Sequence, residues 1–193
     1  LYQNTIGVEF GSKIYSVHQH VKINNILNIQ KRDIKVHFWD TAGQEEFYAI
    51  IKSYFRCIAG IIIVFDLNDR NSFDNIDMWY NKIIENNNCE KDHKHPIMIL
   101  GNKSDRGTSV SQEDIYKKVH DMDALYFEVS AMTNKNLDKA IHGLVNKVYE
   151  NAISLTLNNK ACLGIKDGIN EFIQKHKRRE NNCYSDYQCC SIM

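Results

Sequence analysis

The sequence predicts a mostly parallel, doubly wound α/β sheet with flanking helices, and three observations support this fold class. Strand-like segments alternate with segments of helical spacing along most of the chain. The runs at 60–66 and 97–100 are continuous and apolar, as is typical of parallel strands buried on both faces. Polar residues Asp40, Asn102 and Ser130 fall at the ends of strand-like segments, where ligands of such sheets bind. We therefore expect these three distant positions to share one site.

Each expected strand and helix follows from its local sequence, taken in chain order. Alternating apolar residues at 13–17 and 34–38 predict two paired strands, and the polar, Asn-rich stretch 18–33 between them predicts a mobile surface insertion. Ser111 and Asp114 form a capping box that begins a helix. The other expected elements are a short helix at 49–54, a strand at 60–66, a helix at 73–84, a strand at 97–100, a strand at 125–129 and a helix at 137–148.

Composition limits the classes of function. A chain of 193 residues with 43% hydrophobic residues fits one domain with a tail. Its 24 basic and 24 acidic residues leave no net charge, so we expect no nucleic-acid partner recruited by bulk charge. The six cysteines form no Cys-x-x-Cys pair, which favours reduced thiols in a cytosolic protein.

The stretch 39–47 carries the strongest chemical pattern. A strand delivers the carboxylate of Asp40, which can hold Mg²⁺ through water because Mg²⁺ keeps several waters. The N–H of Gly43 can approach a phosphate oxygen closely, since glycine has no Cβ. Gln44 can orient an attacking water, which phosphoryl transfer needs more than covalent help. A solvated polar turn would explain any one of these residues, but it does not explain the ordered string.

With its neighbours, this stretch resembles the Rab family of small GTPases. The resemblance covers residues 5–153 and the last few residues, and it implies a small G-protein fold that lacks the first strand, the P-loop and the first helix. The segments that carry it are Thr5-Ile6-Gly7-Val8-Glu9-Phe10, Lys35-Val36-His37-Phe38-Trp39, Tyr54-Phe55-Arg56-Cys57, Ile63-Val64-Phe65-Asp66, Gly101-Asn102-Lys103-Ser104-Asp105 and Glu128-Val129-Ser130-Ala131.

The resemblance implies GTP and GDP as ligands, with Mg²⁺ as cofactor. Thr5 and Asp40 would hold the metal, and Thr5 and Gly43 would contact the terminal phosphate. Gln44 would be the catalytic residue. Two loops that order with GTP and relax after hydrolysis would make the switch.

The guanine base would be read by the segments at 102–105 and 130–132. Asp105 can accept two donors from one edge of guanine, a pattern that adenine lacks. The resemblance places Asn102 between the loops, Lys103 over the base, Ser130 beside them and the Ala131 N–H on the guanine carbonyl. Met132 stands where the family usually has lysine, and a flexible thioether can pack on the base in its place. We therefore expect a modest change in affinity and retained specificity.

Surface and tail residues predict the partners. Ile6, Phe10, Trp39 and Tyr54 match positions that Rab proteins present to effectors. The alternative for the three aromatic residues is a place in the core, and their apolarity alone does not decide. The variable tail at 154–193 ends with Cys189 and Cys190, of which the second lies in a C-a-a-X frame. Two geranylgeranyl groups would anchor the protein stably, because one lipid alone binds marginally. We expect the prenylation machinery as a partner and the cytoplasmic face of an intracellular membrane, in exchange with the cytosol, as the location.

No Gly-x-x-x-x-Gly-Lys-Ser/Thr sequence occurs in the 193 residues. We therefore expect residues 1–153 to be a partial GTPase domain from a longer gene product, and this chain alone to bind GTP very weakly or not at all. One interpretation is a GTP-hydrolysing switch in vesicle-mediated protein transport, served by exchange factors, GTPase-activating proteins and effectors. The alternative is a P-loop-less pseudo-GTPase that acts as a membrane-tethered interaction module. The sequence leaves enzymatic activity open between them.

Overall fold

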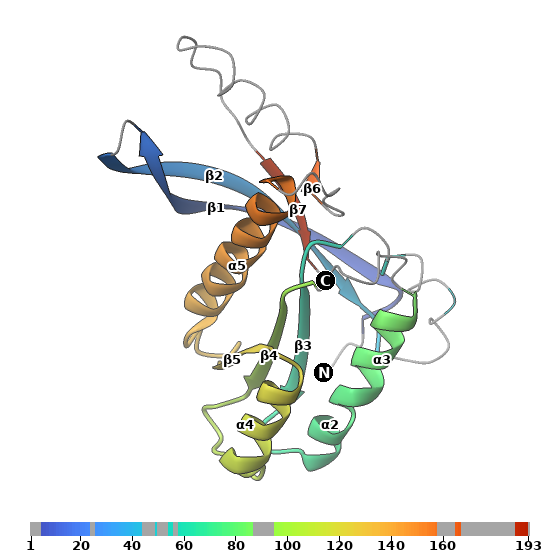
Figure 1. The fold of residues 1–193 in the computed structure, drawn as a ribbon. Helices are drawn as coiled ribbons and strands as arrows, with labels where there is room; N and C mark the ends of the chain where they lie inside the picture. The colour runs from blue at the N-terminus through green and yellow to red at the C-terminus, as the bar shows by residue number, and fades with distance from the viewer. Residues whose placement is uncertain are drawn as a thin grey trace.

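The computed structural model describes residues 5–23, 26–43, 49, 54–55, 58–86, 95–157, 165–166 and 188–192. Its strands form two hydrogen-bonded sheets (Figure 1), where the sequence predicted one. The first has the order β1-β2-β7-β6 and the second the order β3-β4-β5. The strands are β1 Val8–Ile23, β2 Ile26–Thr41, β3 Ile61–Asp66, β4 Ile97–Asn102, β5 Leu125–Glu128, β6 Ile165–Lys166 and β7 Gln188–Ile192.

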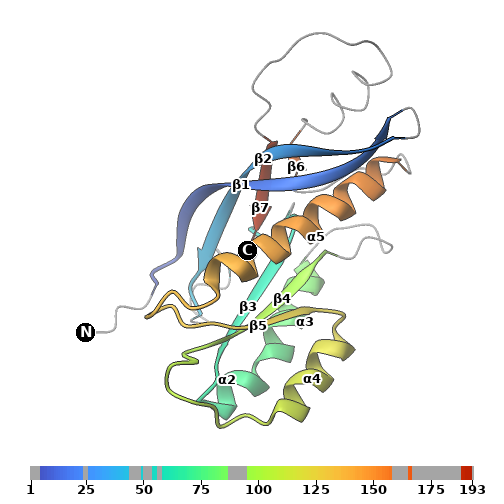
Figure 2. The same cartoon turned by 90° about the vertical axis from the view of Figure 1, so that its left-hand side faces the viewer.

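The second sheet is parallel throughout, and helices cover both of its faces. Alternate residues of β3 and β4 point to opposite sides, and each side belongs to its own buried cluster. One cluster packs against α2, α3 and α4, and the other packs against α5 (Figure 2). The helices are α2 Arg70–Asp74, α3 Ile76–Asn86, α4 Gln112–Asp121 and α5 Leu137–Leu157. The doubly wound prediction is confirmed for this sheet.

The helix boundaries follow local chemistry. The Oγ of Ser111 accepts a hydrogen bond from the Asp114 N–H at 3.1 Å, which confirms the predicted cap of α4. The single helix expected at 73–84 is two helices, α2 and α3, separated at Asn75. Asp69 caps α2 by accepting from the Asn71 N–H at 3.0 Å, so the helical segment begins before the first apolar residue of the pattern.

The long hairpin of β1 and β2 replaces the mobile insertion expected at 18–33, so that prediction was wrong. The antiparallel ladder runs without interruption from Val8 opposite Thr41 to Ile23 opposite Ile26. Residues 24 and 25, between the two strands, lie outside the described residues. The end of the hairpin at which β1 stops and β2 begins lies far from α2 and α4 in both views (Figures 1 and 2).

The end of the chain also differs from expectation. The helix α5 continues to Leu157, and the expected variable tail at 154–193 contributes β6 and β7 to the first sheet. Most of the short helix expected at 49–54 lies outside the described residues. No helix in the described ranges is both long and apolar enough to cross a membrane.

Candidate functional site

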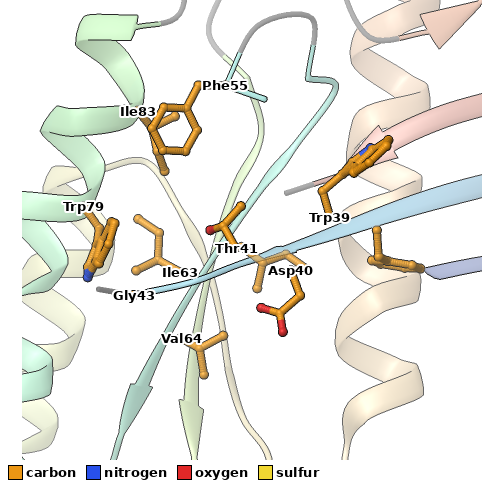
Figure 3. Close-up of a pocket in the computed structure, with 11 residues that line it drawn as sticks. Trp39, Asp40, Thr41, Gly43, Phe55, Ile63, Val64, Trp79 and Ile83 are labelled. Carbon is orange, nitrogen blue, oxygen red and sulfur yellow. The ribbon is translucent and has the colours of Figure 1, made fainter. Parts of the chain in front are cut away.

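A cleft of about 370 Å³ opens between the end of β2 and strand β3 of the other sheet (Figure 3). Its walls are mostly apolar, and Val64 of β3 is 56% exposed although it lies in the middle of a strand. The carboxylate of Asp40 lies at this cleft, so an acidic group borders an otherwise apolar space. Side chains on three elements form its walls, including Asp40 and Thr41 from β2, Ile63 and Val64 from β3, and Trp79 and Ile83 from α3.

The two residues expected at the metal lie together. The Thr5 hydroxyl donates to Oδ2 of Asp40 at 3.3 Å, although 35 positions separate them in the sequence. The Ala42 N–H donates to the Gly7 carbonyl at 2.9 Å, which holds the two segments in place. A hydroxyl and a carboxylate are hard oxygen donors, so they fit Mg²⁺, which fills its remaining positions with water and phosphate.

Gly43 and Gln44 follow Ala42 in the sequence. Gly43 is exposed and lines the cleft, and a Cβ added there would meet only Trp79 at 3.9 Å. Steric crowding therefore does not explain why position 43 is a glycine. Gln44 lies outside the described residues, so its catalytic role stays a prediction.

The second group of predicted residues lies after β4 and β5, at the carboxyl edge of the parallel sheet. The Ser130 Oγ donates to Oδ1 of Asp105 at 2.5 Å, and the Ala131 N–H donates to Oδ1 of Asn102 at 3.1 Å. Two cross-links therefore tie the loops together, as expected for Asn102. The Ala131 N–H, which was expected to meet the guanine carbonyl, is donated to Asn102 in this structure.

The negative charge of Asp105 is stabilised by a neighbouring side chain. The hydrogen bond from Ser130 holds the pKa of Asp105 below its ordinary value. Ser130 itself is fully buried, while Asp105 is exposed. An ionised carboxylate held by a buried hydroxyl is a fixed acceptor for paired N–H donors.

Lys103 has an unusual conformation and a partner that sequence reasoning missed. Its φ is 62°, a left-handed conformation that costs a non-glycine residue roughly 1–3 kcal/mol. Its Nζ lies 2.6 Å from Oδ2 of Asp66, the last residue of β3. Burial opposes ionisation of Asp66, but hydrogen bonds from Lys103 and Asn68 keep its pKa below the ordinary value. Asp66 is part of the segment Ile63-Val64-Phe65-Asp66 that resembles the Rab family. Its position at the end of a predicted strand could have marked it as a site residue.

Met132, at the position usually held by lysine in the family, is 84% exposed. It has few contacts to lose when a planar ligand packs against it. The exposure fits the expectation that a thioether stem covers one face of a base.

Three of the four residues expected to face effectors, Phe10, Trp39 and Tyr54, form an aromatic cluster beside the cleft. The ring centroid of Trp39 lies 4.8 Å from that of Phe10 and 5.2 Å from that of Tyr54. Phe10 is 56% exposed and Ile6 is 82% exposed, whereas Trp39 and Tyr54 are half-buried against the core. The alternative that the three aromatic residues lie in the core is therefore wrong for Phe10.

The backbones of Cys189 and Cys190 lie in β7, beside β2. They are distant in the sequence from every other predicted site residue.

Comparison with known proteins shows the family of the chain. The model of the Ras family matches residues 1–150. Ras-related protein Rab-11B of Dictyostelium discoideum is 34% identical over 198 residues, which cover 97% of this chain and 81% of that protein. Ras-related protein RGP2 of Oryza sativa subsp. japonica is 35% identical over 152 residues, which cover 76% of this chain and 61% of that protein. The chain therefore belongs to the Ras family and is a Rab-like small GTPase.

Proposed function

We propose that this protein is a switch that binds GTP and GDP and hydrolyses GTP, and that it acts in vesicle-mediated protein transport. The observation that carries the proposal is the pair of cross-links between the two loops, from Ser130 to Asp105 and from Ala131 to Asn102. These contacts hold an ionised carboxylate at the carboxyl edge of a parallel sheet, where nucleotides bind in this architecture.

Base recognition follows from the fixed carboxylate. Asp105 accepts the two donors on one edge of guanine, while adenine would leave its oxygens without those donors. The stems of Lys103 and Met132 flank the base. The ion pair of Lys103 with Asp66 fixes the lysine before a ligand arrives, which lowers the entropy lost on binding.

Thr5 and Asp40 would hold Mg²⁺, which neutralises phosphate charge when it is bound. The two side chains already share a hydrogen bond, so little rearrangement is needed to present both oxygens to one cation. Gly43 would offer its N–H to the terminal phosphate, and Gln44 would orient the attacking water.

The aromatic surface of Ile6, Phe10, Trp39 and Tyr54 would bind effectors. Aromatic anchors contribute most of the binding energy in many interfaces, and this surface combines exposed with half-buried rings. It adjoins the residues that would contact phosphate, so ordering of those residues would change its shape. Exchange factors and GTPase-activating proteins would act at the same switch. Geranylgeranyl groups on Cys189 and Cys190 would hold the protein at a membrane.

The rate of GTP hydrolysis tests the proposed function. In the protein expressed from its full coding sequence, Gln44→Leu should slow single-turnover GTP hydrolysis about tenfold or more, because leucine cannot orient water. Nucleotide affinity should stay within about twofold, since the glutamine contacts no base. Gln30→Leu, the same chemical change in the hairpin, serves as the matched control. Equal hydrolysis rates in both variants would remove Gln44 from the mechanism.

A further inference from the structure

The turn that joins β3 to α2, at residues 66–69, is fixed by hydrogen bonds of its own. Oδ1 of Asp66 accepts from the Asn68 N–H at 2.9 Å, which makes an Asx turn, and the Asp69 N–H donates to the Asp66 carbonyl at 3.0 Å. The Asp66 N–H donates to Oγ of Ser72 in α2 at 2.9 Å. The second carboxylate oxygen of Asp66, Oδ2, is thereby held in a fixed position.

The same turn contacts the loop after β4 at three points. The Leu67 N–H donates to the Asn102 carbonyl at 3.0 Å. Nδ2 of Asn68 donates to the Lys103 carbonyl at 3.4 Å, and Nζ of Lys103 lies 2.6 Å from Oδ2 of Asp66. The backbone and the ammonium group of Lys103 are therefore both held from one turn.

The backbone of Lys103 needs this support. Its φ of 62° is left-handed, a conformation that a residue with a Cβ rarely adopts. Without the contact from Asn68, a return to a right-handed or extended conformation would become easier. Such a change would move the Cβ of Lys103, and with it the side-chain stem.

The ion pair between Lys103 and Asp66 is better shielded from solvent than other pairs on this protein. The two side chains are 32% and 21% exposed, whereas those of the pair between Lys13 and Asp138 are 57% and 78% exposed. Solvent and salt weaken exposed pairs, so the pair of Lys103 with Asp66 keeps more of its attraction.

We propose that Asp66 and Asn68 are positioning residues for the nucleotide, of which Asp66 fixes the ammonium group of Lys103 and Asn68 fixes its backbone. The inference rests on the proposed nucleotide site, in which the stem of Lys103 flanks the base. Reading of the guanine edge belongs to Asp105. Asp66 and Asn68 therefore set how tightly a purine is held, and not which purine is chosen.

Affinities for GDP and for inosine diphosphate test the role of Asp66. In the protein expressed from its full coding sequence, Asp66→Asn should weaken calorimetric binding of both nucleotides about tenfold, because a charge-assisted hydrogen bond is lost. The ratio of the two affinities should stay within about twofold, since inosine lacks only the amino group that Asp105 would bind.

The matched control for this substitution is Asp69→Asn, the same change in the same turn. Asparagine also caps a helix, so α2 keeps its first hydrogen bond, and GDP affinity should stay that of the unsubstituted protein. Equal weakening by Asp66→Asn and Asp69→Asn would overturn the role of Asp66.

A double-mutant cycle separates positioning from general stability. Lys103→Met keeps an unbranched stem and removes the ammonium group. In this background Asp66→Asn should weaken GDP binding no further, whereas Asn68→Ala should still weaken it, because the carbonyl of residue 103 remains. A full additional loss from Asp66→Asn in the Lys103→Met background would show that Asp66 does not act through Lys103.

Nuclear magnetic resonance of the nucleotide-free protein separates this inference from the proposed function. The scalar coupling between the amide and α protons of Lys103 reports its φ and should change in Asn68→Ala. Asn71→Ala, the same change within α2, should leave it as it is. An unchanged coupling in Asn68→Ala would overturn the role of Asn68. If the unsubstituted protein bound no GDP, the proposed function would fail, while a changed coupling in Asn68→Ala would still support the hold on Lys103.

Discussion

An Asp105→Asn substitution should lower the preference for GTP over ATP by roughly 10²-fold or more. The asparagine keeps one acceptor but places an N–H₂ donor where guanine already presents donors. It also loses the charge that shortens and strengthens such hydrogen bonds. Competition binding in the protein expressed from its full coding sequence measures the ratio.

Two comparisons make this result specific. Asp121→Asn, the same change at an exposed position of α4, should leave the ratio unchanged. Xanthine has a carbonyl in place of the guanine amino group, so the Asp105→Asn variant should gain affinity for xanthosine triphosphate. An unaltered ratio of GTP to ATP in the Asp105→Asn variant would contradict the assignment of this loop to the base.

Replacing both Cys189 and Cys190 by serine should move the protein from the membrane fraction to the cytosol. Serine has no sulfur for a thioether bond to lipid, and each CH₂ that no longer inserts costs about 0.8 kcal/mol of binding. Nucleotide binding should be unchanged, since neither cysteine belongs to the proposed nucleotide site. Fractionation of tagged variants measures the distribution.

The single substitutions refine this prediction. Each should give partial and more reversible attachment, because one lipid chain alone binds marginally. The basic residues at 175–179 should matter most in these single variants, and their contribution should fade at high salt. A double-serine protein that still pellets with membranes would show that the anchor lies elsewhere.

The parallel sheet and its binding edge could be predicted because local signals and tertiary structure agree there. The continuous apolar runs became β3 and β4, although Val64 of β3 is 56% exposed, and the capping residues of α4 were readable from Ser111 and Asp114. Asn102 was expected to tie the loops together, and it does so by accepting a hydrogen bond from the Ala131 N–H, which was expected to meet guanine instead. Strong periodicity and short connections leave few alternative arrangements for these residues.

The remaining features depend on pairing between distant segments. Residues 18–33 were assigned to a loop because polar composition hides strand pairing, yet the ladder that starts at Val8 continues through them. The contact of Lys103 with Asp66 needed the register of β3 and β4 to be known, since Asp66 lies directly opposite Asn102. The docking of β7 on β2 had no sequence signal, because a polar tail with two cysteines suggests modification rather than a strand.

The most direct test of guanine recognition is a nuclear magnetic resonance titration of the ¹⁵N-labelled protein, expressed from its full coding sequence, with GDP and Mg²⁺, and with ADP and Mg²⁺ as the control. This method detects weak binding and reports each backbone amide separately. GDP should shift the amides of Asn102–Asp105 and Ser130–Met132, and ADP at the same concentration should leave them unchanged. Identical responses to the two nucleotides, or no response to GDP at millimolar concentration, would contradict the account and favour an interaction module that works without nucleotide.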